Sequence, residues 1–487
     1  MRYEAHGRWL RTLEPGTWNL EPGMWNIKQL TIIKTMNRRD FAKVAVTGAA
    51  GLSMSPTIIT GTGWKGSNDR VNIAVIGIRS MGQSHIAGYS ASKNARVAAI
   101  CDVDSNLFDE RIKNLFTDKG LPKPKIYTDL RKVFEDKEID AVSITTPNHW
   151  HALASIWALQ AGKHVSVEKP CCHNFFEGKK LVEAAEKYRL IVQDGAEQRS
   201  NPCAQSMADY LHSGKLGEVY MAKGLCYKWR DTIGKAHEEP VPAGVDYDLW
   251  LGPAPKRPFT KNRFHYNWHW NWDFGNGDMG NQGVHEMDIA RWGLDVTLPT
   301  KITAIGGHLM FEDDQQTPNV LMAVMEFPNP KGGGDKKKIL QFEVRHWITN
   351  REAIKSENPD DGNTYMVSTD NTVGNLFYGS KGFMTKNVNE WETFLGKERI
   401  AGDRGIGLGD HYSDFVEAIR ANDQKIAKGD IKEGFYSCAL IHLANISFRL
   451  GRTLEFDPVK MKFINAPDAD AMLTREYRKP FVVPENV

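Results

Sequence analysis

The chain has 487 residues, of which 41% are hydrophobic and 25% charged, and its formal net charge at pH 7 is +2. This length predicts two ordinary domains with additional segments, and the composition is that of a globular protein. The near-neutral charge argues against nucleic acid or an anionic membrane as a partner. The 14 tryptophans indicate an aromatic-lined pocket.

Residues 1–35 contain a tandem repeat of seven residues, Leu13–Asn19 followed by Leu20–Asn26, with a Pro-Gly pair in each copy. Such a short repeat cannot pack a core of its own. We therefore interpret residues 1–35 as a mis-assigned upstream extension and expect Met36 to be the true start.

Residues 36–67 follow the pattern of an export signal and a linker. Arg38 and Arg39 precede an aromatic and a basic residue, and a weakly apolar, Ala/Gly-rich stretch continues to about Ile59. This pattern resembles a twin-arginine signal, which exports folded proteins. It predicts a periplasmic protein with a tightly bound cofactor, or a cytoplasmic protein if the signal is not functional. The stretch is too short for a stable membrane span.

Residues 68–190 alternate apolar strands with helical stretches, a pattern that predicts an α/β domain with a doubly wound parallel sheet. The predicted strands are Val71–Ile76, Val97–Cys101, Ala141–Thr145 and His164–Val167. The predicted helices are 106–119, 130–136, 151–161 and 176–188. Ligands of open parallel sheets bind outside the carboxyl ends of the strands, so the residues after each strand are candidates for a dinucleotide site.

The turn after the first strand contains Gly77, Arg79, Met81 and Gly82, which we assign to cofactor binding. It departs from the dinucleotide fingerprint because Arg79 occupies the position of the middle glycine. Asp102 ends the next strand, at the spacing of an acceptor for the ribose hydroxyls. A carboxylate there repels a 2′-phosphate and favours NAD, whereas Arg79 keeps NADP open as an alternative. Asp102 could instead cap a helix.

The last two strand ends complete the predicted site. The third strand leads into a polar turn expected to cover the nicotinamide ribose, with the cofactor-binding candidates Thr146, Pro147, Asn148 and His151. This histidine could equally be a helix cap or a surface residue. Glu168 and Lys169 follow the fourth strand, so both are expected at the cofactor, with Lys169 facing it as the first candidate for catalysis.

The six cysteines are Cys101, Cys171, Cys172, Cys203, Cys226 and Cys438. They form no C-x-x-C motif and no ligand-like cluster in the sequence, so we predict no metal site. We expect all six to be reduced and mostly buried.

After residue 190 the pattern changes to that of an antiparallel sheet with long aromatic connections. We predict a substrate-binding α+β domain over residues 191–465 and a C-terminal tail over 466–487. The predicted strands are 217–226, 301–309, 321–327 and 339–344. An aromatic and polar run over 256–272 contains Trp268 and Trp270, which suit stacking on sugar rings.

A helix is predicted from Asn281 onward. Asn281, His285 and Asp288 have the spacing i, i+4, i+7 and would lie on neighbouring faces. A histidine that titrates near neutrality can take the proton of a sugar hydroxyl as hydride leaves its carbon. His285 is therefore a catalytic candidate and the other two are substrate-binding candidates, although a lone helical histidine can also be structural.

These motifs together resemble the glucose–fructose oxidoreductase/inositol dehydrogenase/MocA (Gfo/Idh/MocA) family over about residues 68–460. The matching segments are 77–82, 101–104, 146–149, 168–170, 283–288, 377–382, 411–415 and 443–451. The resemblance implies a Rossmann domain followed by an α+β domain whose large, mostly antiparallel open sheet mediates homodimers or homotetramers.

The resemblance also implies roles for single residues. Lys169 would orient and polarise the reacting hydroxyl, His285 would be the acid/base, and Gln198 and Arg199 match a substrate-side motif. One departure concerns the position four residues before the histidine. Many family members carry aspartate there, whereas this chain has Asn281, so His285 lacks an ionisable partner at that position.

Three functions remain open from the sequence. The first is an NAD-dependent oxidoreductase acting on a secondary hydroxyl of a sugar, cyclitol or glycoside. The second is a redox-neutral NAD-dependent glycoside hydrolase, as in the family's α-N-acetylgalactosaminidases, although the chain lacks their usual histidine-glycine signature. The third is a non-enzymatic, cofactor-dependent binding protein, which the presence of both Lys169 and His285 argues against.

Overall fold

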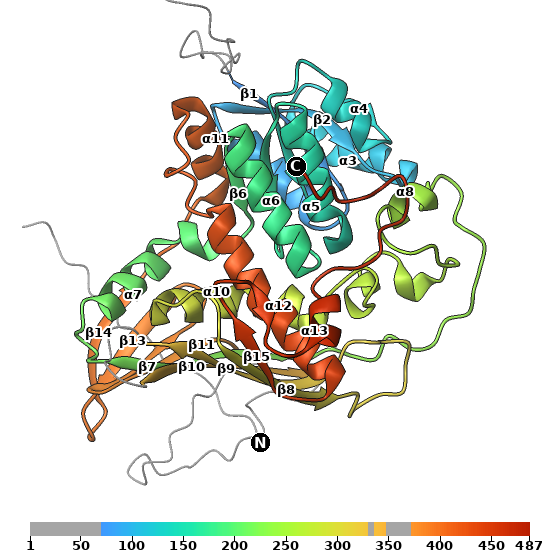
Figure 1. Ribbon diagram of the computed structural model, residues 1–487. Coiled ribbons are helices and arrows are strands. Elements are labelled where there is room, and N and C mark those ends of the chain that lie inside the picture. The colour runs from blue at the N-terminus through green and yellow to red at the C-terminus, as the bar shows by residue number, and fades with distance from the viewer. Residues whose placement is uncertain (1–69, 330–335, 347–371) are drawn as a thin grey trace, which may run out of the picture. The chain divides into compact units, whose positions relative to one another are not determined.

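The computed structural model describes residues 70–329, 336–346 and 372–487. The heptad repeat, the twin-arginine-like pair Arg38 and Arg39, and the predicted segments 1–35 and 36–67 lie outside the described residues, so these interpretations stay predictions. Residues 64–487 belong to one unit, and its described part contains two sheets (Figure 1).

The first sheet has six strands in the order β3-β2-β1-β4-β5-β6, and every neighbouring pair is parallel. The strands are β1 (Val71–Ile76), β2 (Ala95–Cys101), β3 (Lys125–Tyr127), β4 (Ala141–Ile144), β5 (His164–Val167) and β6 (Val192–Asp194). Apolar runs such as β1, buried on both faces, are typical of parallel sheets covered by helices. The predicted doubly wound Rossmann sheet is confirmed.

Helices connect these strands and cover the sheet. They are α2 (Met81–Ala91), α3 (Phe108–Leu115), α4 (Leu130–Glu135), α5 (Asn148–Gln160) and α6 (Phe175–Tyr188). The predicted helix 106–119 is divided into a 3-10 turn (Ser105–Leu107), α3 and a second 3-10 turn (Thr117–Lys119). The Asp104 side chain caps the first turn and Gly120, at a φ of 68°, ends the second. The sequence analysis missed β3 and β6, because three residues carry too little periodicity to be recognised.

The second sheet has ten strands in the order β14-β13-β12-β11-β7-β10-β9-β8-β15-β16. The strands are β7 (Val219–Lys228), β8 (Lys301–Gly307), β9 (Val320–Pro328), β10 (Lys337–His346), β11 (Thr372–Gly379), β12 (Gly382–Lys386), β13 (Glu390–Leu395), β14 (Ile400–Ile406), β15 (Leu454–Asp457) and β16 (Lys462–Phe463). Only β7 and β10 pair in parallel among these neighbours. The predicted mostly antiparallel sheet is confirmed.

Helices lie along one face of this second sheet (Figure 1). They include α7 (Pro202–His212), α10 (Gly283–Leu294) and α12 (Ile431–Leu450). Because helices cover only one face of the sheet, buried and exposed side chains alternate along β9. Leu321, Ala323 and Met325 are buried, whereas Met322 is exposed. The buried face therefore fixes the register of the strands against the helices.

The long helix α12 connects the two sheets, because it contacts α6 and β6 of the first and β8 of the second. The Asp430 carboxylate caps its first turn, and Gly451 ends it in the left-handed conformation. A second connection comes from α11 (His411–Ala421), whose Tyr412 ring packs on Gly88 of α2. The strand ends of the first sheet are thereby held against elements of the second.

The C-terminal segment returns to the first sheet after α13 (Pro467–Ala471). Phe481 and Val483 are buried, and the Phe481 ring lies 5.4 Å from the Trp150 ring on α5. Residues 466–487, which the sequence analysis treated as a tail, thus contribute to the core of the dinucleotide domain.

The cysteines confirm one expectation, since all six are free thiols and buried. Three of them converge, because α12 brings Cys438 against Cys171 and Cys172 after β5. The sequence could not show this group, since residues separated by 267 positions leave no local spacing to recognise. The prediction that the protein has no metal site stays a prediction.

Phe342 offers a test of how α10 is held on the sheet. Its ring is fully buried on β10 and closely approaches Gly283 of α10 and Gly224 of β7. Phe342→Ala is expected to lower the free energy of unfolding by about 3–5 kcal/mol because it leaves a cavity beneath the helix. Urea unfolding followed by fluorescence measures this. The control Val459→Ala, at an 89% exposed position, should change it by less than about 0.5 kcal/mol. Equal effects would contradict this account.

Candidate active site

A cavity of about 350 Å³ lies at the carboxyl ends of β1, β2, β4 and β5 and extends to the 3-10 turn Asn267–Trp270 and to α9 (Gly277–Asn281). Its volume is in the range of small-molecule sites, about 300–1,000 Å³. Nine of the predicted cofactor residues line it or flank it: Gly77, Arg79, Met81, Asp102, Thr146, Pro147, Asn148, His151 and Glu168. Lys169 lines the same cavity. Parallel strands therefore bring these separated motifs to one edge of the sheet.

Two glycines keep the turn after β1 tight. Gly77 has a φ of 87°, and a Cβ there would lie 2.9 Å from the Thr145 carbonyl carbon and oxygen. A Cβ on Gly82 would lie 2.0 Å from the Gly77 oxygen, so only glycine fits at the start of α2. Gly82 itself does not line the cavity, but it lets the helix N-terminus approach the strand end, where phosphate groups bind in such folds.

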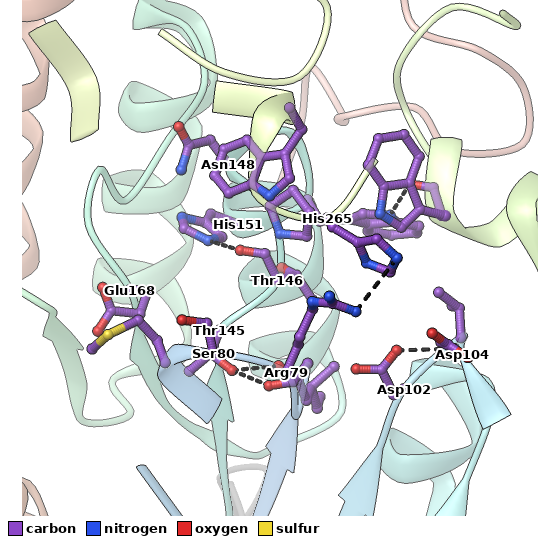
Figure 2. Close-up of a pocket in the computed structure, with 18 of the residues that line it drawn as sticks. Arg79, Ser80, Asp102, Asp104, Thr145, Thr146, Asn148, His151, Glu168 and His265 are labelled. Carbon is purple, nitrogen blue, oxygen red and sulfur yellow. Dashed lines mark hydrogen bonds between the residues drawn. The ribbon is translucent and has the colours of Figure 1, made fainter. Parts of the chain in front are cut away.

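Asp102 is held at the end of β2 by backbone amides. Its Oδ2 accepts a hydrogen bond from Ile78 N at 2.8 Å. Its Oδ1 accepts one from Asp104 N at 2.9 Å (Figure 2). Burial raises the pKa of Asp102 to about 6, against the opposing effect of these two amides. The carboxylate keeps free lone pairs on the cavity side, which suits an acceptor for two ribose hydroxyls.

The turn after β4 contains polar atoms that have no partner within the described protein. Thr146 Oγ1 and Asn148 Oδ1 are buried and accept or donate no hydrogen bond. Buried polar atoms of this kind require a partner, so their presence at the cavity fits a bound polar group such as the nicotinamide nucleotide. His151 does not face outward but lies between the Thr146 and Pro170 carbonyl oxygens, with its ring nitrogens 2.6 and 2.7 Å from them, and its neutral ring donates a hydrogen bond to one of the two. It positions the turn against the segment after β5.

Lys169 and Glu168 are positioned by separate contacts. The Lys169 Nζ donates a hydrogen bond to the Asn281 carbonyl oxygen at 2.6 Å, which joins the end of β5 to α9. Glu168 lies 2.9 Å from His85 Nε2, and the other ring nitrogen of His85 is 2.7 Å from Ser143 Oγ. Burial alone would raise the pKa of Glu168, but His85 and Lys169 outweigh it and lower the pKa to about 2. A permanent negative charge therefore adjoins the Lys169 ammonium.

His285 lies on α10, half-buried, near the Lys169 charge. Burial and then the charge of Lys169 lower the pKa of His285 to about 3. The imidazole is consequently neutral at physiological pH, but a pKa this low makes it a weaker base than the histidine titrating near neutrality that the sequence led us to expect. The predicted single helix from Asn281 is corrected, because α9 ends at Asn281 and α10 begins at Gly283. Asn281 therefore contacts Lys169 through its backbone, from a different helix than His285.

The aromatic run forms one wall of the cavity. Trp268 lines it and stacks on His269, with ring centroids 3.6 Å apart. Trp270 is instead buried beneath the Arg230 guanidinium, 4.9 Å from the ring centroid, and lines a neighbouring hollow with Trp229 and Gln315. Only the first of these two predicted tryptophans therefore faces the cofactor cavity.

Three predicted substrate residues lie away from the cavity lining. Arg199 forms a bidentate ion pair with Asp288, at 2.7–3.1 Å, and Asp288 is 1% exposed. Asp288 also accepts a hydrogen bond from Ser437 Oγ on α12. Gln198 accepts a hydrogen bond from Lys386 Nζ at 3.2 Å. In this structure Arg199 and Asp288 hold α10 and α12 together.

The sequence analysis missed two groups of polar residues near the site. His265 Nε2 is 3.4 Å from the Arg79 guanidinium, across the cavity (Figure 2). Asp278 on α9 is buried between Arg230 and His346, at 2.5 and 2.6 Å. Desolvation raises the pKa of Asp278, but His346 and Arg230 outweigh it, so the net pKa is lowered. No local motif marks these groups, although the aromatic run around His265 was recognised.

Two family models match the chain. A model described as oxidoreductase family, NAD-binding Rossmann fold, matches residues 71–196, and one described as oxidoreductase family, C-terminal alpha/beta domain, matches 206–323 and 405–483. Together they cover well over half of the chain. The protein therefore belongs to the Gfo/Idh/MocA oxidoreductase family, as the sequence motifs indicated, and is a nicotinamide-dependent oxidoreductase.

Similar curated proteins match in part. A glycosyl hydrolase family 109 protein from Shewanella pealeana is 32% identical over 171 residues, which is 31% of this chain and 37% of that protein. Another from Saccharopolyspora erythraea is 27% identical over 164 residues, 32% of this chain and 35% of that protein. The chain thus matches only about a third of the length of these relatives.

Solved structures show the same fold over most of the chain. The WlbA dehydrogenase from Bordetella pertussis, in complex with NADH and UDP-GlcNAcA, has a TM-score of 0.57 and 16% identity, covering 80% of this chain and 99% of that one. Levoglucosan dehydrogenase, in complex with NADH and levoglucosan, has a TM-score of 0.58 and 17% identity over 80% of this chain and 99% of that one. At this identity the likeness establishes the fold.

Glu286, the residue after His285, provides a pH test of the packing around the site. It is buried, and burial raises its pKa to about 8, partly offset by hydrogen bonds from the Gln282 amide. In the folded state Glu286 keeps its proton until the pH approaches 8, whereas in the unfolded state it loses the proton above about pH 4.3. The free energy of unfolding therefore falls as the pH rises towards 8.

Glu286→Gln, which keeps the shape and removes the titration, is expected to gain stability relative to the native protein as the pH rises from 5 to 8.5, by up to about 1.4 kcal/mol per pH unit. Urea midpoints at both pH values measure the difference. Glu417→Gln, at an exposed position on α11, is the control and should show no such trend. A constant difference for Glu286→Gln would contradict a raised pKa.

Proposed function

We propose that the protein oxidises a secondary hydroxyl of a sugar, cyclitol or glycoside with NAD as hydride acceptor. The observation that carries this proposal is the position of Lys169, whose ammonium lies at the carboxyl end of β5 and is held by the Asn281 carbonyl beside a neutral His285. Alcohol oxidation requires a cation and a proton acceptor. Lys169 lines the dinucleotide cavity, whereas His285 does not line it but lies near the Lys169 charge.

The residues of the cavity fit a nicotinamide dinucleotide. Gly77 and Gly82 allow the tight turn that brings the N-terminus of α2 to the cavity, where a pyrophosphate can bind, and Thr146 and Asn148 contribute polar groups to the lining. The nicotinamide ring, when bound, supplies a hydride acceptor. Asp102 supports NAD rather than NADP as the cofactor, because a buried carboxylate repels a 2′-phosphate.

In the proposed reaction, Lys169 donates a hydrogen bond to the substrate hydroxyl and stabilises negative charge on its oxygen. His285 accepts the hydroxyl proton, and the hydride leaves the same carbon, so the alcohol becomes a ketone. Glu168, kept ionised by His85, balances the Lys169 charge. Trp268 provides a flat apolar surface on which a sugar ring can stack.

A second function is favoured by one observation, the match to proteins described as glycosyl hydrolase family 109. In that case the nicotinamide would accept hydride from a glycoside hydroxyl, with Lys169 and His285 in the same roles. The aglycone would then be eliminated, water would add to the resulting double bond, and the hydride would be returned to the ketone. The cofactor would then be regenerated within each turnover. The solved dehydrogenases of the same fold support the first function.

We further propose that the protein is a homo-oligomer. The sheet face opposite the helices exposes Ile305 and Met322, at 72% and 46%, a pattern that suits burial against a second copy.

Asp102 is the residue on which cofactor choice is expected to depend. Asp102→Ser should weaken NAD binding about 10- to 100-fold, the value of a hydrogen bond to a charged group, and reduce the preference over NADP. Titration of protein fluorescence with each cofactor measures both affinities. For the native protein, NAD affinity should fall below about pH 6, where Asp102 becomes protonated, and this dependence should be absent in the variant. Asp109→Ser, at an exposed position on α3, is the control. An unchanged preference would contradict the assignment.

A panel of free sugars, cyclitols and aryl glycosides distinguishes the two catalytic functions. Reduced nicotinamide that accumulates in step with product supports the dehydrogenase, whereas released aglycone without net reduction supports the hydrolase.

Lys169→Met is expected to lower either rate by about 100-fold or more, because the cation that stabilises the alkoxide is lost. Lys113→Met, at a position exposed on α3, should retain the native rate. Full turnover by Lys169→Met would refute the proposed mechanism.

A further inference from the structure

Three sulfur atoms meet between the segment after β5 and helix α12. Cys171 and Cys172 follow Pro170 at the end of β5, and Cys438 lies in the middle of α12. Cys171 Sγ is 3.6 Å from Cys438 Sγ, and the three sulfurs lie within 4.8 Å of one another. Among the residues that the structure describes, this is the only group of three or more potential metal ligands.

A fourth ligand-type side chain adjoins these sulfurs. His442 Nε2 is 3.4 Å from Cys172 Sγ, and His442 follows Cys438 by one helical turn on α12, so both side chains point to the same side of the helix. All three cysteines are fully buried and His442 is 4% exposed. Water is therefore excluded from the group, and no position remains open to a substrate.

Two of the separations are those of a tetrahedral zinc site. Bonds of about 2.3 Å from zinc to sulfur and about 2.0–2.1 Å from zinc to nitrogen require separations of about 3.8 Å between sulfurs and about 3.5 Å between sulfur and nitrogen. The observed 3.6 Å and 3.4 Å are close to these values. His442 Nε2 contacts Cys172 Sγ but does not lie within 4.8 Å of all three sulfurs, so metal binding would require its ring to move towards the other two.

We propose that Cys171, Cys172, Cys438 and His442 bind one structural Zn²⁺ ion. Three thiolates and a neutral imidazole are a known structural donor set for zinc, and binding displaces the thiol protons. The ion would connect the segment that carries Lys169, two residues before Cys171, to the helix that packs on both sheets. Zinc would then stabilise the geometry on which the catalytic lysine depends without taking part in the reaction.

Metal analysis of the purified full-length protein tests this proposal. Protein prepared without added metal or chelator should contain about one zinc per chain by inductively coupled plasma mass spectrometry. Cys172→Ser and Cys438→Ser should lower that content at least about tenfold, because each removes one thiolate ligand. Cys203→Ser, which changes a buried cysteine of α7 outside the cluster, should keep the full content.

A second measurement decides the matter even if the cluster variants fold poorly. Native protein in which Co²⁺ replaces zinc should show a thiolate-to-cobalt charge-transfer band, and Cys203→Ser should show the same band. Metal-free native protein with six thiols that react after denaturation would overturn the proposal, and so would a disulfide between Cys171 and Cys438. These readouts do not depend on cofactor or substrate, so they remain separate from a test of the enzymatic function.

Discussion

Parallel pairing of β1, β2, β4 and β5 is the constraint from which the site follows. Each strand ends at the same edge of the sheet, so turns separated by up to about 90 residues of chain become neighbours. The Gly77 turn, Asp102, the Thr146 turn and Lys169 are contributed in this way. These four segments are distant from one another along the chain. The hydrogen-bonded register of the sheet brings them together.

The second sheet completes the site through helices rather than strands. A hydrogen bond from the Lys169 ammonium to the Asn281 carbonyl joins the two halves at the proposed point of reaction. The helices that supply Asn281 and His285 are held by buried ion pairs, Arg230 with Asp278 and Arg199 with Asp288. Buried pairs of this kind contribute little net stability. They favour a single arrangement of the helices, because breaking a pair would leave an unpaired charge in the interior.

Charge balance around Lys169 shapes the chemistry available. Glu168, ionised through its contact with His85, lies on one side, and His285, kept neutral by burial and by the lysine itself, lies on the other. Glu168 thus balances the charge of Lys169, although the described residues show no direct ion pair between the two. The Lys169 ammonium can therefore still donate a hydrogen bond to a substrate oxygen. Cys171 and Cys172 follow Lys169 by two and three residues and contact Cys438 on α12, so the proposed catalytic lysine and the cysteine cluster share one short stretch of chain.

The sequence by itself determined the class of fold, the dinucleotide edge and the family, because apolar runs and turn residues at strand ends are local patterns. Val71–Ile76 and His164–Val167 appear as predicted, and the residues after them line the cavity. Only the tertiary structure decided which polar residues face that cavity. Arg199 and Asp288 looked like substrate ligands but form an internal ion pair, and Cys438 meets Cys171 across 267 positions. Contacts of this kind depend on how α10 and α12 pack, which no spacing along the chain records.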